Sequence, residues 1–167
     1  MRHPSEAPAP LADAKGLRFA VVVSRFNSQV TARLLDGALS TLAAAGAPSS
    51  AVEVFEVPGA FELPLVARLA GSAGRFDAVV CLGCVVRGET PHFEYISSAV
   101  AHGVTDAALA TGVPVTFGVL TTNTLDEALT RSEDGPSNKG REAAAAAIEM
   151  ARLVRRMRAV RTPGLRV

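Results

Sequence analysis

Residues 76–86 have the sequence FDAVVCLGCVV, a continuous apolar run with the length of one strand. Such a run is typical of a strand covered on both faces, as in the parallel sheets of α/β proteins. A helical pattern follows it, from about Pro91 to Thr111. The segment therefore predicts a strand–helix unit, and the flanking sequence repeats it.

Three other apolar runs have strand length. They are LRFAVVV at residues 17–23, VEVFEV at 52–57 and VPVTFGVLTT at 113–122. Helical patterns follow them, from about Ser28 to Ala45, from about Leu63 to Ala73 and from about Leu125, and a final helix is expected from about Lys139 to Met157. This alternation predicts an α/β fold, a three-layer α/β/α sandwich around a central parallel sheet of about four strands.

Two finer expectations concern burial. Cys81 and Cys84 are three apart in a strand, so they should point to opposite faces as two ordinary buried thiols. The final helix should bury one apolar stripe, made of Ala143, Ala147, Met150, Ala151, Val154 and Met157.

Composition favours one domain that binds small molecules. The chain has 167 residues, 49% of them hydrophobic, and a net charge of +1, so no strong field points to nucleic acid or a membrane as partner. No apolar run approaches the ~20 residues of a membrane span, and the cytoplasm is the expected location. We expect a domain at residues 17–157, an extended or mobile Pro- and Ala-rich arm at 1–16 and a basic tail at 158–167.

Ligands of parallel α/β sheets bind where strands end, and the first two strand ends carry unusual residues. Phe26 follows the first strand and has two interpretations. Its ring either stacks on a planar heterocycle or packs under a loop. Glu62 follows the Pro58–Gly59 turn. Its carboxylate fits two roles, accepting hydrogen bonds from sugar hydroxyls or interacting with the positive end of the following helix.

The third strand is followed by RGETPHFE at residues 87–94. Thr90 is the expected N-cap, with Pro91 at the first helical position, so the backbone N–H groups there offer an anion site. The positive helix end favours a neutral imidazole at His92, able to relay protons, although a lone histidine is more often structural. Further on, Arg131 and Lys139 flank a polar loop and are either a phosphate-binding pair or solvated cations.

Five motifs occur in a fixed order: RFN, VPGAFELP, LGCVVRGETPHFEYI, FGVLTTNT and NKG. Together they resemble the lumazine synthase family over about Leu17 to Met157. The resemblance implies a flavodoxin-like topology and the condensation of 5-amino-6-ribitylaminouracil with 3,4-dihydroxy-2-butanone 4-phosphate to 6,7-dimethyl-8-ribityllumazine, with loss of phosphate and water. It implies no cofactor and no metal.

The resemblance also implies a role for each motif residue. Phe26 stacks on the pyrimidine, Asn27 and the segment Gly59, Ala60, Phe61 and Glu62 bind the ribityl chain and hold the ring, Val85 and Val86 line the pocket, and Phe117 and Lys139 close it. The phosphate is held by backbone donors at Glu89 and Thr90 and by the side chain of Arg131. His92 moves protons.

The assembly implied is a pentamer, in some members a shell of sixty subunits, with each site shared between neighbours. The short stretch from Arg131 to Lys139 favours the shell. The resemblance also suggests riboflavin synthase as a partner. Two other hypotheses for the function stay open: a catalytically silent shell and a riboflavin-binding protein of the same fold. A flavodoxin-like nucleotide binder is disfavoured, since residues 24–27 are not a phosphate loop rich in Ser, Thr and Gly.

Overall fold

The computed structural model describes residues 10–160, so most of the expected arm and tail (1–9 and 161–167) lies outside the described residues. Within residues 10–160 four strands form one parallel sheet in the order β2-β1-β3-β4. The strands are β1 (Phe19–Ser24), β2 (Val52–Val57), β3 (Ala78–Val86) and β4 (Val115–Thr122). This confirms the predicted parallel sheet, and the order is that of the flavodoxin-like fold.

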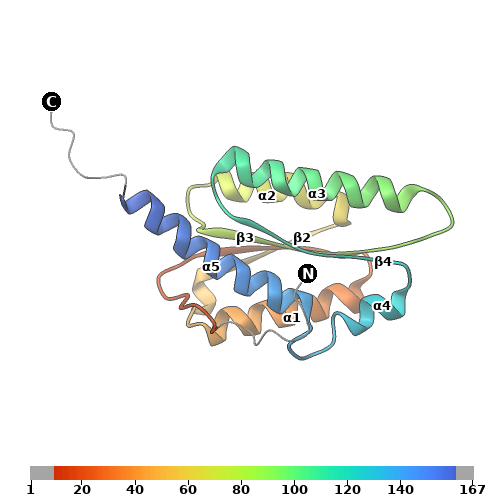
Figure 1. Cartoon of the computed structure of the whole chain (residues 1–167), viewed down its shortest axis with the longest axis horizontal. Helices are drawn as coiled ribbons and strands as arrows, with labels where there is room; N and C mark the ends of the chain where they lie inside the picture. Colours follow the sequence, from red (N-terminus) through yellow and green to blue (C-terminus); the bar gives the residue numbers. More distant parts are fainter. Residues whose placement is uncertain (1–9, 161–167) are drawn as a thin grey trace.

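Helices cover both faces of the sheet (Figure 1). One layer holds α2 (Leu63–Ser72) and α3 (His92–Thr111), and the other holds α1 (Ser28–Ala44), α4 (Leu125–Thr130) and α5 (Lys139–Val160). Two 3₁₀ turns, η1 (Ser49–Ala51) and η2 (Ala60–Glu62), flank β2. The three-layer prediction is confirmed, and every strand feeds a loop at the same carboxyl edge.

β3, one of the two inner strands, is buried on both faces up to Cys84, as its unbroken apolar run predicted. Cys84 belongs to the core under α1 and α5, and Cys81 to the core under α2 and α3. Burial raises the pKa of the Cys81 thiol to about 12 and that of Cys84 to about 11. The prediction of two buried thiols on opposite faces is confirmed.

The crossing of α1 and α5 requires a glycine. A Cβ at Gly140 would lie 1.9 Å from the carbonyl oxygen of Leu34 on α1, so only the bare backbone fits. The same contact fixes where α5 begins, and therefore where Lys139 stands.

The expected buried stripe of α5 is partly wrong. Met150 is 40% exposed and Met157 61% exposed, whereas Ala144 and Ile148 are fully buried. The helix also continues to Val160, and its last turns extend past the sheet (Figure 1), so apolar residues there have no layer to cover them.

Three arginines at this end of α5 hold neighbouring loops. Arg152 donates to the carbonyl oxygens of Asp13 and Lys15, each at 2.7 Å. Arg155 binds the Asp77 carboxylate at 2.8 and 2.9 Å and the Gly16 carbonyl at 2.8 Å. Arg158 donates to the carbonyl oxygen of Gly112 at 2.8 Å, and Ala14, inside the expected arm, is fully buried. The proposed domain limits stay predictions, but these residues are attached to the domain.

The predicted cap of α3 is wrong by one residue. Pro91 stands at the N-cap and His92 is the first helical residue, with no side chain capping the end. A proline ring fixes φ near the value a helix needs, and here it ends the loop instead of opening the helix. No helix within residues 10–160 is long and apolar enough to cross a membrane.

Candidate active site

A pocket of about 420 Å³ opens at the carboxyl edge of the sheet, and we call it the Phe26 pocket. Its walls are mostly apolar, with few polar groups, which is the usual character of a small-molecule site. The lining residues are Phe26, Gly59, Ala60, Phe61, Cys84, Val85, Val86, Gly88, Thr90, His92, Phe93 and Ile96.

Phe26 is presented to this pocket by a tight turn after β1. Its backbone N–H donates to the carbonyl oxygen of Pro58 at 3.1 Å, while its side chain stays 69% exposed. Asn27 next to it has φ +59, the single positive φ among the non-glycine residues 10–160. Its side-chain amide donates to the Cys84 carbonyl at 3.0 Å, so Asn27 ties α1 to β3 and does not line the pocket.

The turn after β2 is held by Glu62. One carboxylate oxygen accepts the N–H of Gly59 at 2.9 Å, which folds residues 59–62 into the 3₁₀ turn η2. This leaves the second oxygen for a ligand. This contact is local to η2, and both roles that the sequence left open for Glu62, toward sugar hydroxyls and toward the start of α2, stay predictions.

The loop after β3, residues 88–91, borders the pocket through Gly88 and Thr90. Gly88, Glu89 and Thr90 are exposed, and no backbone–backbone hydrogen bond within residues 10–160 uses their N–H groups. His92 follows at the first position of α3 and is exposed to the same pocket. Free N–H groups and a helix start are the elements of an anion site, with an imidazole beside it.

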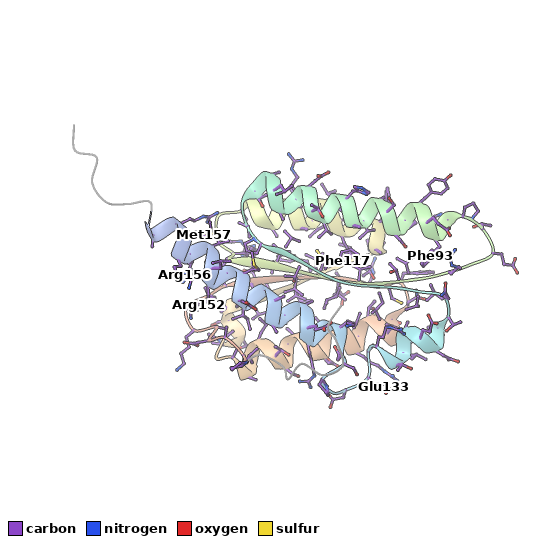
Figure 2. The ribbon with its side chains drawn as sticks, in the orientation of Figure 1. Phe93, Phe117, Glu133, Arg152, Arg156 and Met157 are labelled. Carbon is purple, nitrogen blue, oxygen red and sulfur yellow. The ribbon has the colours of Figure 1, made fainter. Side chains whose placement is uncertain are left out.

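A second hollow of about 630 Å³, the Arg131 pocket, runs along the free edge of β4. It contains Phe117, Arg131 and Lys139 together with Glu127 and Glu142. Phe117 is 44% exposed on this edge strand. Figure 2 shows Phe93 beside the start of α3 and Phe117 further along the sheet.

Arg131 and Lys139 are held together at the base of their loop. The N–H of Lys139 donates to the Arg131 carbonyl at 3.0 Å, and the buried Asn138 side chain donates to the Ser132 carbonyl at 2.8 Å. Asn138 also accepts the N–H groups of Gly140 and Arg141, at 2.9 and 3.2 Å, which caps α5. The Lys139 ammonium pairs with Glu142 at 2.6 Å.

Eleven of the fourteen predicted site residues fall into two groups on one chain. Most of them line the Phe26 pocket, and Phe117, Arg131 and Lys139 line the Arg131 pocket. Asn27, Glu62 and Glu89 line neither pocket.

Sequence reasoning missed Phe93, Ile96 and Glu142 as lining residues. Spacing offered a signal for two of them, because Ile96 is four residues after His92 and Glu142 is three after Lys139 on helices. Within residues 10–160, no group of three or more His, Cys, Asp or Glu side chains is arranged to hold a metal ion.

The chain is thus an α/β/α protein whose parallel sheet has a mostly apolar pocket at its carboxyl edge, the usual place and character of a small-molecule site in this class. Residues 16–155 match the model of the 6,7-dimethyl-8-ribityllumazine synthase family. The chain belongs to this family.

Two curated relatives are similar over nearly their whole length. The 6,7-dimethyl-8-ribityllumazine synthase of Syntrophus aciditrophicus is 53% identical over 144 residues, which cover 86% of this chain and 94% of the relative. That of Desulfotalea psychrophila is 50% identical over 141 residues, 84% of this chain and 91% of the relative.

Proposed function

We propose that the chain condenses 5-amino-6-ribitylaminouracil with 3,4-dihydroxy-2-butanone 4-phosphate to form 6,7-dimethyl-8-ribityllumazine, with release of phosphate and water. The observation that carries the proposal is the Phe26 pocket, in which an exposed aromatic ring, an unpaired backbone loop and His92 meet in a member of this family. An aromatic wall fits a planar pyrimidine, and the loop fits a phosphate.

The pyrimidine side of the site is the apolar part of the pocket. Phe26 stacks on the ring, while Val85 and Val86 form the floor at the end of β3. Gly59, Ala60 and Phe61 bring backbone and an aromatic edge close to the ribityl chain, with the free oxygen of Glu62 as acceptor for its hydroxyls. Asn27 contributes by holding the β1–α1 turn against Cys84.

The phosphate side is the loop 88–91 and a guanidinium. The N–H groups of Glu89 and Thr90 donate to phosphate oxygens, and Arg131 supplies charge-assisted hydrogen bonds. Arg131 uses one donor for the Glu127 carbonyl, at 2.8 Å, and a guanidinium has five donors. Enough remain for two phosphate oxygens.

The chemistry needs an imine to form, phosphate to leave and a ring to close. Each step moves protons at nitrogen or carbon next to the bound phosphate, where His92 stands. Two aligned reactants undergo such steps readily, so we assign most of the rate to positioning and about 10- to 100-fold to His92.

We further infer that each site is shared between two chains of a pentamer. In one chain Phe26 and His92 lie in one pocket, and Phe117, Arg131 and Lys139 lie in the other, which supports completion of a site by a neighbour. Large apolar side chains are also exposed on one chain, among them Phe26, Phe61, Leu65, Leu69, Tyr95 and Phe117. Exposed apolar surface of this extent is typical of an interface.

Three finer expectations stay predictions: the sixty-subunit shell, riboflavin synthase as partner and the cytoplasm as location. Analytical ultracentrifugation of the purified protein separates a pentamer from a shell. Co-purification with riboflavin synthase tests the partner.

The function is tested by mixing the purified protein with the two substrates and following product absorbance together with phosphate release. Equal amounts of lumazine and phosphate are expected. A silent shell gives neither signal, and a riboflavin-binding protein gives tight riboflavin binding without turnover. Either result would contradict the proposal.

A further inference from the structure

Arg87, directly after β3, has no role in the proposed reaction, yet it joins the ends of β3 and β4 to the start of α3. Its N–H donates to the carbonyl of Thr122, the last residue of β4, at 2.9 Å, which extends the β3–β4 pairing one residue past the end of β3. Its side-chain Nε donates to the Asn123 side-chain oxygen at 3.0 Å. Arg87 therefore ties the end of β3 to the end of β4.

The same guanidinium also reaches the first turn of α3. One terminal nitrogen pairs with the Glu94 carboxylate, and the guanidinium carbon lies 4.4 Å from the ring centroid of Phe93. The hydrogen bond from Arg87 lowers the pKa of Glu94, so this carboxyl stays ionised at neutral pH. A planar group that bonds at its edge and stacks on its face is held in one orientation.

These contacts join the two ends of the loop 88–91. The loop leaves β3 at Arg87 and enters α3 at His92, and the guanidinium bridges from its beginning to Phe93 and Glu94 just past its end. The loop needs this support, because the N–H groups of Gly88, Glu89 and Thr90 take no part in the backbone–backbone hydrogen bonds of residues 10–160 and α3 has no side-chain cap.

Phe93 links the contacts of Arg87 to the Phe26 pocket. Its ring contacts Arg87, and Phe93 also lines the Phe26 pocket. His92, its neighbour in the sequence, lines the same pocket. A shift of Arg87 thus moves the ring, the imidazole and the loop N–H groups together. Misplacement by about 1 Å is enough to cost about 100-fold in a reaction that depends on alignment.

We propose that Arg87 is a positioning residue that, through Asn123, Phe93 and Glu94, holds the loop 88–91 and His92 in the geometry that binds the phosphate of the sugar substrate. This rests on the proposed function only for the identity of the substrate. The geometric claim concerns an anion at the loop, and inorganic phosphate is a sufficient probe.

The chain offers a matched control, Arg75. It pairs with Glu53 and lies 4.5 Å from the ring centroid of Phe76, and its side chain is 49% exposed against 44% for Arg87. It precedes β3, at the opposite edge of the sheet from the loop. Arg75→Ala therefore removes the same kinds of contact away from the site.

The experiment compares Arg87→Ala, Arg87→Lys, Glu94→Ala and Arg75→Ala in the assembled protein, by calorimetric binding of inorganic phosphate and by KM for each substrate. For Arg87→Ala we expect at least about a 10-fold loss of phosphate affinity and a similar rise in KM for the sugar phosphate, with KM for the pyrimidine within about 2-fold. Arg75→Ala should change none of these by more than about 2-fold.

The other two variants separate positioning from direct contact. Lysine keeps the charge and loses the planar fork, so Arg87→Lys should not restore binding. Glu94→Ala should weaken phosphate binding too, and Arg87→Ala/Glu94→Ala should be no worse than Arg87→Ala alone. If Glu94→Ala instead leaves phosphate binding unchanged or tightens it, or if lysine restores it, Arg87 acts as a charge on the ligand and the proposal is wrong.

The proposed function and the positioning role of Arg87 are refuted by different results. A wild type that forms no lumazine refutes the proposed function, while the phosphate titration still tests Arg87. A wild type that is active, with Arg87→Ala equal to Arg75→Ala or with both KM values raised alike, refutes the positioning role alone. If Arg87→Ala does not assemble, Glu94→Ala carries the same test.

Discussion

Replacing Arg131 with alanine should weaken the binding of the sugar phosphate far more than the binding of the pyrimidine. Arg131 is exposed at the end of α4, and its guanidinium has donors left over after its bond to the Glu127 carbonyl at 2.8 Å. The fold therefore does not depend on the charge, and the phosphate proposed for this position does.

The size of the effect follows from the kind of bond. A hydrogen bond between charged groups contributes about 1.5–3 kcal/mol, and about 1.4 kcal/mol is tenfold in an equilibrium constant. Arg131→Ala should therefore raise KM for the sugar phosphate about 10- to 150-fold, with KM for the pyrimidine within about 2-fold.

The assay varies one substrate at a time at saturation with the other and follows lumazine absorbance. Arg156→Ala, an exposed arginine on α5 outside both pockets, is the control and should resemble the wild type. Equal rises in both KM values, or none in either, would refute the phosphate role of Arg131.

Three other predictions concern catalysis, metals and pH. His92→Ala should lower kcat about 10- to 100-fold and leave measurable activity, because alignment persists; complete loss in a correctly assembled variant would assign proton transfer a larger share. Steady-state assays in EDTA should show full activity, and loss that only a divalent metal restores would contradict the cofactor-free reaction. Above pH 9 the unfolded Cys81 thiol ionises while the folded one, with its pKa raised to about 12, keeps its proton. Stability should therefore fall by about 1.4 kcal/mol per pH unit from this group, and denaturation of Cys81→Ala should show a shallower decline; an identical pH slope would contradict the raised pKa.

The sequence was informative about the sheet because strand burial is a local property. β3 is apolar without interruption, so the burial of both its faces and of its two cysteines follows from the residues themselves. The grouping of Phe26, Gly59 and His92 also followed, since the ends of parallel strands share one edge.

Contacts between distant segments were not predictable in the same way. Met157 continues an apolar stripe, but whether a layer covers it depends on where the sheet ends. Met150 is 40% exposed although Ile148 and Ala151 beside it are buried, so the exact face of α5 that packs on the core was not predicted either. Arg152 and Arg155 look like solvated charges in the sequence, and they bind carbonyl groups of residues 13–16, more than 130 positions away. The αL conformation of Asn27 and the bridge made by Arg87 depend likewise on tertiary partners.

A site assembled from two chains is tested most directly by mixing two defective ones. One chain carries Phe26→Ala/His92→Ala and the other Arg131→Ala, which damage different pockets of the monomer. Co-expressed in equal amounts and assayed well below KM for the sugar phosphate, they should pair an intact Phe26 pocket with an intact Arg131 pocket at about a quarter of the interfaces, because a cyclic assembly joins unlike surfaces. The activity of the mixed assemblies, divided by their number of sites, should rise to about a quarter of the wild-type value. This is well above the mean activity of the two defective proteins assayed alone. Mixed assemblies, confirmed by native mass spectrometry, that stay at the parental mean would place the whole site within one chain.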